Sequence, residues 1–156
     1  MPIDEFRFRQ TLGYFASGVT VATTAHNGHL YGMTVSSFAS VSLKPPLVLI
    51  CIDKTLNTHT AIVESSQFAV NILEQRQEHL SRRFATSEND KFTGVAWHTG
   101  RFGLPVLEGA LAVIECQLRD TFAGGDHSIF VGEVMDAEIS AGSPLLYYRR
   151  GYRELV

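Results

Sequence analysis

Four hydroxyl side chains lie close together in the segment GMTVSSFAS at 32–40: Thr34, Ser36, Ser37 and Ser40. Successive side chains of a strand point to opposite faces, so Thr34, Ser36 and Ser40 are expected to share one face. Hydroxyls and free backbone amides together suit a flat polar heterocycle that needs several hydrogen bonds. The same pattern also fits a strand edge whose hydroxyls serve only local turns.

A second candidate is the segment CIDKTLNTH at 51–59, which is typical of a strand that runs into a helix. The N-terminus of a helix carries roughly half a positive charge and unpaired N–H groups, which suit a phosphate. Lys54 adds a full charge, and further donors follow at Thr55, Asn57 and Thr58. Asp53 offsets part of this field, so we expect its carboxylate to meet a neutral donor rather than a phosphate. An ordinary capped helix with a solvated lysine would have the same pattern.

The segment AGGDHSIF at 123–130 is the third candidate. Two glycines let the backbone approach a ligand closely, and His127 follows them directly. A histidine there can donate to a polar group such as a carboxamide or a pyrophosphate, or act as a proton donor near neutral pH. The alternative is a turn capped by Asp126 with a histidine on the surface.

Other kinds of chemistry lack their sequence patterns. The six histidines form no HExxH motif and no close pair with a cysteine, so we expect no metal site. No GxSxG motif supports a serine hydrolase. No GxGxxG follows a strand, so any nicotinamide nucleotide has to bind in another way than in a Rossmann domain.

Composition narrows the class of protein. The 156 residues are 45% hydrophobic and 19% charged, as in one ordinary globular domain, which we expect to span 1–156. A net charge of −3 argues against a nucleic-acid binder. No apolar run could cross a membrane, and charges in MPIDEFRFRQ replace the apolar stretch of a signal peptide. With only two distant cysteines, Cys51 and Cys116, we expect a cytoplasmic protein with reduced thiols.

Strands are expected to dominate the elements that position these residues. Asp4 can cap an opening helix that Gly18 ends, and two more helices are expected within 54–66 and 74–84. Asn27–Gly28 predicts a hairpin turn, and Gly32 is expected to break the strand that follows it. The remaining expected strands are 18–25, 47–53, 67–73, a long hairpin of 107–122 with 128–140, and 144–156; the segment 85–105 is expected to be a loop.

This order of elements predicts a mainly β fold, a six- or seven-stranded closed antiparallel barrel with two or three peripheral helices. Side chains fill the interior of a barrel this small. A ligand is therefore expected outside the barrel or at a seam between subunits.

Several of these segments together resemble the short-chain flavin reductases, the NAD(P)H:flavin oxidoreductase components of two-component flavin-dependent monooxygenases. The similarity runs from about residue 8 to 152 and is carried by GMTVSSFASVSLKPPLVLICIDK at 32–54, GDHSIFVGEV at 125–134, and the segments 18–24, 68–73, 83–85 and 144–152. It implies a split β-barrel that binds FMN or FAD in a groove at a homodimer interface.

The resemblance also implies a set of binding residues. Those expected along the flavin ring and its side chain are Met33, Thr34, Val35, Ser36, Ser37, Ser40, Val41, Cys51, Ile52, Asp53 and Lys54. Those expected at the phosphate end are Thr55, Asn57, Thr58, Phe84 and Ala85. His127 would contact the nicotinamide nucleotide as the catalytic residue, with Tyr148 and Arg149 nearby.

The implied function is reduction of FMN or FAD by NADH or NADPH, with hydride transfer to flavin N5 and diffusion of reduced flavin to a partner monooxygenase. A protein that only holds flavin, or a sensor, is the alternative, but such a protein needs no nicotinamide contact like His127. A relative of the pyridoxamine-phosphate oxidases would need more basic phosphate ligands than Lys54 alone. The motifs leave open FMN against FAD, NADH against NADPH, and the monooxygenase served.

Overall fold

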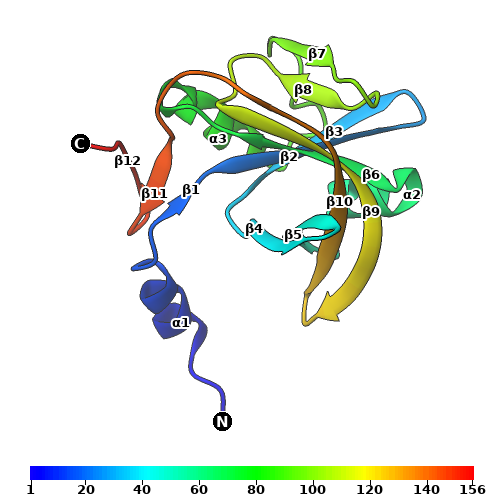
Figure 1. The fold of residues 1–156 in the computed structure, drawn as a ribbon. Coiled ribbons are helices and arrows are strands. Elements are labelled where there is room, and N and C mark those ends of the chain that lie inside the picture. Colours follow the sequence, from blue (N-terminus) through cyan, green and yellow to red (C-terminus); the bar gives the residue numbers. More distant parts are fainter.

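The computed structural model describes residues 1–156, and strands make up most of it (Figure 1). The helices are α1 (Glu5–Leu12), α2 (Asn57–Ser65) and α3 (Glu78–Phe84), the last preceded by the 3-10 turn η1 (Gln75–Gln77). The strands are β1 (Ser17–Gly18), β2 (Thr20–His26), β3 (His29–Val35), β4 (Ala39–Leu43), β5 (Pro46–Asp53), β6 (Gln67–Ile72), β7 (Trp97–Thr99), β8 (Pro105–Leu107), β9 (Ala112–Gly124), β10 (His127–Ile139), β11 (Leu146–Tyr148) and β12 (Gly151–Arg153).

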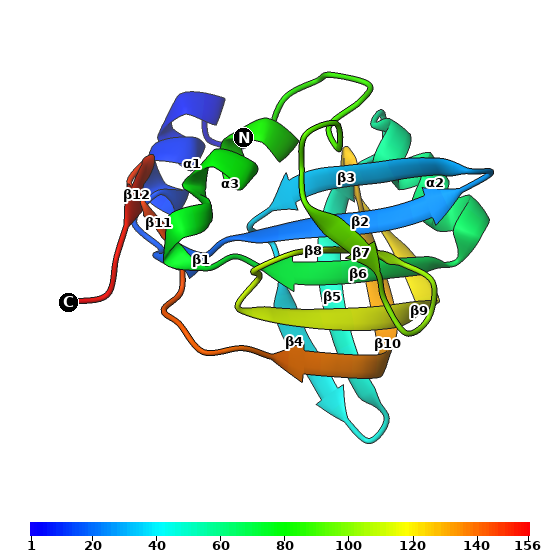
Figure 2. The same cartoon turned by 90° about the horizontal axis from the view of Figure 1, so that it is seen from above.

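Seven strands form one antiparallel sheet in the order β3-β2-β6-β9-β10-β5-β4. The sheet coils, so that β3 at one edge comes close to β5, the neighbour of the other edge strand β4. Figure 2 shows the curved sheet from above. The two edges do not pair with each other, so the mainly β split barrel is confirmed. The closed barrel that the order of elements predicted is wrong, because β3 has only β2 as a partner and β4 has only β5.

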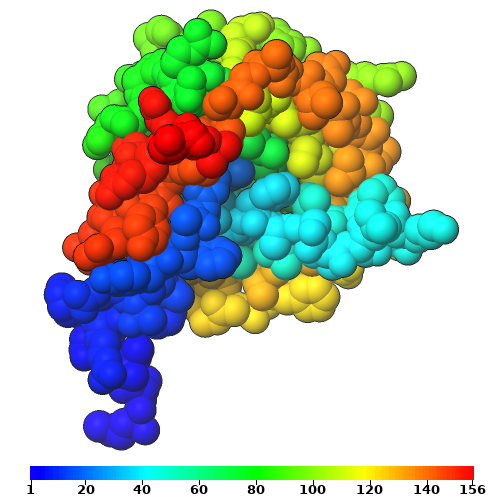
Figure 3. All heavy atoms as spheres, turned by 60° about the vertical axis from the view of Figure 1, so that its left-hand side comes forward, coloured from blue at the N-terminus to red at the C-terminus, as the bar shows by residue number.

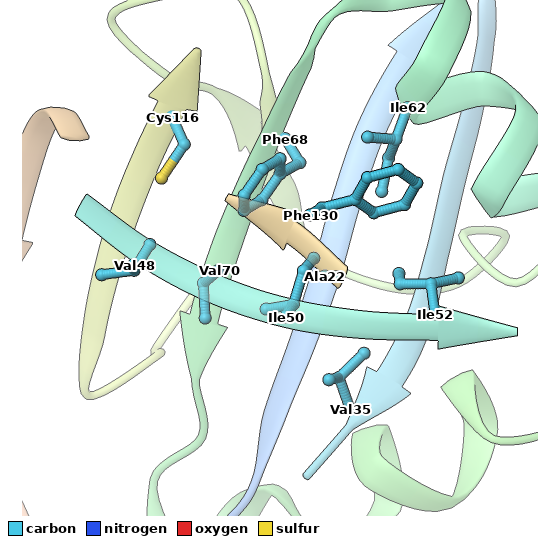
Figure 4. Packing of buried hydrophobic residues seen from close by; sticks show 10 residues of the cluster. All are labelled: Ala22, Val35, Val48, Ile50, Ile52, Ile62, Phe68, Val70, Cys116 and Phe130. Atoms are coloured by element: carbon cyan, nitrogen blue, oxygen red, sulfur yellow. The ribbon is translucent and has the colours of Figure 1, made fainter. Parts of the chain in front are cut away.

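Two apolar cores hold this sheet. One fills the inside of the coil with ten buried residues, among them Ile50, Phe68 and Phe130, and Ile62 of α2 closes one end of it (Figure 4). The other lies between the sheet and α3, where Leu80 and Phe84 are buried. The second core matters for function because it places the end of α3 beside β3.

The structure corrects several expected boundaries. The first helix ends at Leu12 rather than at Gly18, although Asp4 does cap it by accepting from the Arg7 N–H at 2.8 Å. Strand β3 continues through Gly32, and the break comes later, at 36–38. The loop 85–105 contains the short strand β7, which pairs with β8.

The final segment is a hairpin rather than one strand, because Arg149 and Arg150 have positive φ angles and turn the chain between β11 and β12. This hairpin pairs with β1 and lies beside the start of the chain, where the Arg149 N–H donates to the Gly13 carbonyl at 2.8 Å. Helix α1 projects below this corner, as the blue atoms in Figure 3 show. No residue of α1 is buried.

No helix of this structure is long and apolar enough to cross a membrane.

Candidate functional site

A cavity of about 560 Å³ lies at the opening of the barrel, along the edge of β3 that no strand covers. One wall comes from the start of α2 and the turn before it, and the other from the end of α3 and the loop after it (Figure 2). Seven of the expected site residues line it: Met33, Thr34, Thr55, Asn57, Thr58, Phe84 and Ala85. The expected ring end and the expected phosphate end thus share one cavity.

The free edge of β3 forms the floor of this cavity. The backbone N–H and C=O groups of an edge strand that point away from its neighbour have no strand partner. The Gly32 carbonyl is one such group, and it accepts from the Lys91 ammonium at 3.0 Å. Gly32 has no room for a side chain, because a Cβ there would lie 2.7 Å from the Phe84 ring. Gly32 therefore lets the Phe84 ring pack directly against the backbone of β3, and side chains of the same strand, such as Tyr31 and Met33, line the cavity.

The α2 wall is shaped by Asp53. Its carboxylate accepts from the Thr55 N–H at 2.8 Å and from the Thr55 hydroxyl at 2.7 Å. These two hydrogen bonds lower the pKa of Asp53. The carboxylate is thus held by neutral donors, as its sequence position predicted. No side chain caps α2, so N–H groups of its first turn are open to an anionic ligand.

The opposite wall is the loop 85–93, which two cations hold in place. The Arg83 guanidinium donates to the Lys91 carbonyl at 2.8 Å and to the Thr93 carbonyl at 3.1 Å. The Lys91 ammonium donates to the Phe84 carbonyl at 3.1 Å as well as to β3. Burial lowers the pKa of Lys91. The loop is expected to present a fixed surface to a ligand, because both of its ends are bonded to the core.

A second group of expected residues lies on the outer face of β5 and β10, next to the cavity. The Ser37 hydroxyl is 3.1 Å from both the backbone N and the backbone O of Cys51. Asp53 and His127 face each other as register partners of these two strands. His127 Nδ1 lies 2.7 Å from the Asp126 carboxylate, and the ring is partly exposed. None of these four residues lines the cavity along β3.

Six other expected residues point away from this face or only flank it. The side chains of Val35 and Ile52 are buried in the barrel core, so only their backbone can reach a ligand. Ser36 and Lys54 are exposed, and the Lys54 backbone N–H donates to the Asp126 carbonyl at 3.0 Å. Ser40 and Val41 lie on β4, at the other edge of the opening.

Tyr148 and Arg149 lie apart from the other expected residues. They belong to the small sheet of β1, β11 and β12, where the Arg149 guanidinium stacks 4.7 Å above the Tyr14 ring. The Tyr14 and Tyr148 rings meet edge to face at 6.2 Å. In Figure 1 this corner and the start of β10 lie on different sides of the molecule. Within one chain, therefore, Tyr148 and Arg149 do not lie beside His127, with which they were expected to form the nucleotide site.

The structure adds residues that the sequence patterns did not single out. His29, Leu30, Tyr31, Glu88, Asn89, Lys91 and Phe92 also line the cavity. The alternation of β3 places Tyr31 and His29 on the same face as Met33, so a strand argument could have found them. Nothing local marks Lys91, which reaches the cavity only because the loop folds back onto β3.

His59 is another addition. Its Nε2 lies 2.8 Å from the Ser128 hydroxyl, and its ring packs 4.9 Å from that of Phe130. Burial, followed by the charge of Lys54, lowers the pKa of His59. This contact ties α2 to the residue next to His127, so it joins the cavity wall to the outer face.

No group of three or more histidine, cysteine, aspartate or glutamate side chains in the structure is arranged to hold a metal ion. The two cysteines are unpaired. Burial raises the pKa of the Cys116 thiol to about 12, so that thiol is inert, while Cys51 is half-buried on the outer face.

Comparison with known proteins agrees with this geometry. Residues 12–156 match the family described as the flavin reductase like domain. The reductase component of 4-nitrophenol 4-monooxygenase/4-nitrocatechol 2-monooxygenase from Rhodococcus opacus is 44% identical over 155 residues, which is 99% of this chain and 83% of that protein.

Solved structures give the same result. The flavin reductase PheA2 in its native state has a TM-score of 0.91 and 42% identity, and the alignment covers 99% of both chains. The NADH:FAD oxidoreductase SgcE6 of Streptomyces globisporus C-1027, solved with NAD and FAD fragments, has a TM-score of 0.94 and 40% identity over 98% of this chain and 93% of that one.

Proposed function

The chain belongs to the flavin reductase like family, and from this premise we propose that it is an NAD(P)H:flavin oxidoreductase acting as one domain over 1–156. It reduces FMN or FAD with NADH or NADPH and supplies the reduced flavin to a separate monooxygenase. The relatives support this activity, since they include the reductase component of a two-component monooxygenase and an NADH-dependent FAD reductase. The observation that carries it is the shared cavity between residues 33–34 of β3 and residues 55–58 at the start of α2.

We propose that the flavin lies across the opening of the barrel. Its ring would lie over the Met33–Ser37 segment and the outer face at Cys51–Asp53, with Ser40 and Val41 at the far edge. Its phosphate end would lie in the cavity, between Thr55–Thr58 and the Phe84–Ala85 step. The free edge of β3 and the uncapped start of α2 support this placement, because they offer backbone groups to a polar ring and to an anion.

When bound, the flavin would supply the acceptor for a hydride from the dihydronicotinamide. The transfer needs no acid or base from the protein, so the residues act by position. The free edge of β3 and the Ser37 region would orient the ring and stabilise negative charge on it when reduced. His127 would hold the nicotinamide nucleotide on the open side of the ring.

A homodimer is part of this proposal. Helix α1 exposes three apolar side chains, with Phe6 at 66%, Phe8 at 51% and Leu12 at 55%, and Phe15 just after the helix is 80% exposed. Leu43 at the tip between β4 and β5 is 90% exposed, and Ile139 at the end of β10 is 88% exposed. Exposed apolar groups of this extent are typical of a face that another subunit covers. A second copy could also bring Tyr148 and Arg149 toward His127 of its partner.

We further propose a cytoplasmic location, in which Cys51 and Cys116 stay reduced.

A steady-state assay that crosses NADH and NADPH with FMN, FAD and riboflavin tests the activity. We expect oxidation of at least one nucleotide that depends on added or bound flavin. Binding of flavin without any turnover would instead support a protein that only holds flavin. Oxidation of neither nucleotide in the presence of each flavin would refute the reductase function.

A further inference from the structure

The residues on both sides of His127 are bonded to the segment that leads into α2. The Asp126 carbonyl accepts from the Lys54 backbone N–H at 3.0 Å. The Ser128 hydroxyl lies 2.8 Å from Nε2 of His59, which stands in the first turn of α2. His127 is therefore held between two attachment points, one to the backbone before α2 and one to a side chain of α2 itself.

The contact between His59 and Ser128 is a polar pair at the edge of an apolar core. Ser128 is 5% exposed, and both its register partner Ile52 and Phe130, two positions along the strand, are buried in the barrel core (Figure 4). The centroid of the His59 ring lies 4.9 Å from that of Phe130. A buried hydroxyl without a partner is costly, so His59 both satisfies Ser128 and holds its side chain in one orientation.

The surroundings of His59 keep its ring neutral. Burial, followed by the positive charge of Lys54, lowers the pKa of this imidazole below its ordinary value of 6.5. A neutral imidazole has one N–H and one free ring nitrogen, so it can serve Ser128 either as donor or as acceptor. A leucine of similar size would fill the same space against Phe130 but could not make this bond.

The two attachment points join parts of the site that are proposed to bind different reactants. The start of α2, at Thr55–Thr58, lies at the proposed phosphate end of the flavin, and His127 lies on the proposed nicotinamide side. Hydride transfer requires the two rings at contact distance, and a misplacement of about 1 Å can cost up to about 100-fold in rate. His59 itself does not line the cavity, so its effect on the rate has to pass through its neighbours.

We propose that His59 is a positioning residue, which through Ser128 fixes His127 relative to the start of α2 and so sets the distance between the flavin and the nicotinamide. This role rests on the proposed flavin reductase function. When the bond between His59 and Ser128 is lost, each reactant keeps its own binding contacts and only their relative placement changes. The role therefore predicts slower hydride transfer at unchanged affinities.

Anaerobic single-turnover reduction of flavin bound to excess protein measures the transfer step, at saturating NADH or NADPH according to which one the wild type oxidises. We expect His59→Leu and Ser128→Ala each to slow this step about tenfold and to leave the dissociation constants of flavin and nucleotide within about twofold of wild type. The nucleotide constant comes from the dependence of the rate on nucleotide concentration. His79→Leu is the matched control, because His79 is exposed on α3, and it should match wild type.

Two further variants separate positioning from packing. Glutamine carries a polar atom at about the reach of Nε2, so His59→Gln should recover most of the lost rate. Because His59 and Ser128 act through one bond, the double change His59→Leu with Ser128→Ala should be no slower than either single change. Ser128→Ala removes only a hydroxyl, so it decides the test if His59→Leu fails to fold.

Unchanged rates in both single variants, beside an active wild type, would overturn the role of His59 and leave the reductase function standing. A slow His59→Leu that glutamine does not restore, beside a normal Ser128→Ala, would also overturn it, since His59 would then act only by packing. Weaker flavin binding at an unchanged transfer rate would count against it in the same way. Absence of wild-type turnover would refute the reductase function, and the role of His59 with it.

Discussion

The cavity along β3 and the open face around His127 differ in how much of each a single chain builds. The cavity has a floor, two walls and bonded loop ends within one chain, and its residues come from segments more than fifty positions apart. On the open face His127 and Asp53 lie side by side and partly exposed, whereas Tyr148 and Arg149 belong to the separate corner of β1, β11 and β12. One half of the proposed chemistry is thus preformed within one chain, and the other half is, in our proposal, completed by a second subunit.

This difference shows what each half has to achieve. A polar tail with a phosphate needs fixed donors, and a protein supplies them best from a packed scaffold. A nicotinamide nucleotide has to arrive and leave in every cycle, so its site can be open on one side. Mutations in the cavity should therefore change mainly the flavin affinity, and mutations on the open face should change mainly the KM for the nucleotide.

Phe84→Ala should have the largest effect, because it acts on the preformed half. Phe84 is fully buried and packs under Gly32 and against Phe92, with ring centroids of 5.1 Å in the latter pair. Removal of a buried phenylalanine typically costs about 3–5 kcal/mol of unfolding free energy. Urea unfolding and flavin titration should show lower stability and weaker flavin binding. Phe122→Ala, on the exposed part of β9, should change neither, and equal effects of the two variants would contradict this role for the cavity floor.

The double change Phe8→Glu with Phe15→Glu tests whether the nucleotide site needs the proposed dimer. Both side chains are exposed on or just after α1 and touch no core, so the monomer should still fold. We expect light scattering to show a monomer, with kcat/KM for the nucleotide reduced by a factor on the order of ten or more and a smaller loss of flavin affinity. A wild-type protein that is monomeric and fully active would refute the proposal that a dimer interface completes the nucleotide site.

His127→Ala should raise the KM for the nicotinamide nucleotide several-fold and leave the flavin dissociation constant almost unchanged. The loss of one hydrogen bond to a ligand is worth about 1 kcal/mol, or roughly fivefold. His127→Gln, which keeps a donor, should recover part of the loss. An unchanged nucleotide KM would show that the nucleotide binds elsewhere on the open face.

A pH series gives the smallest expected effect. Burial lowers the pKa of Lys91 below its ordinary value of 10.5, so between the lowered value and 10.5 the unfolded chain holds more protons than the folded one. The free energy of unfolding contributed by this group therefore rises with pH in that window. Lys91→Met should lose this slope relative to wild type in urea unfolding at several alkaline pH values. Parallel pH profiles of the two proteins would mean that Lys91 is not desolvated.

Local sequence determined much of the fold. Short apolar runs predicted β5 and β6, and alternation of apolar and polar residues predicted the β9–β10 hairpin. Asn27–Gly28 predicted the turn between β2 and β3, and Asp4 predicted the start of α1. These features depend on residues within a few positions of one another, so periodicity and turn chemistry are sufficient to find them. The expected helix to Gly18 failed because the segment after Leu12 has to turn and pair with β11.

The site was predictable in part. Hydroxyls at 34–37 and donors at 55–58 were found from residue type, and the resemblance joined them to Phe84 and His127. The inward side chains of Val35 and Ile52 could not be assigned with certainty from type, because either face of an apolar strand can be buried. Tyr31 was overlooked although strand alternation puts it beside Met33.

The sequence alone determined which strands form, where the polar donors stand along the chain and, through its motifs, the family. Only the tertiary structure decided that β3 keeps a free edge, that Lys91 bonds to that edge, and that the loop 85–93 closes the cavity opposite α2. The physical reason is that a strand's pairing and a lysine's burial depend on which distant segments pack against them. No local pattern of side chains carries that information.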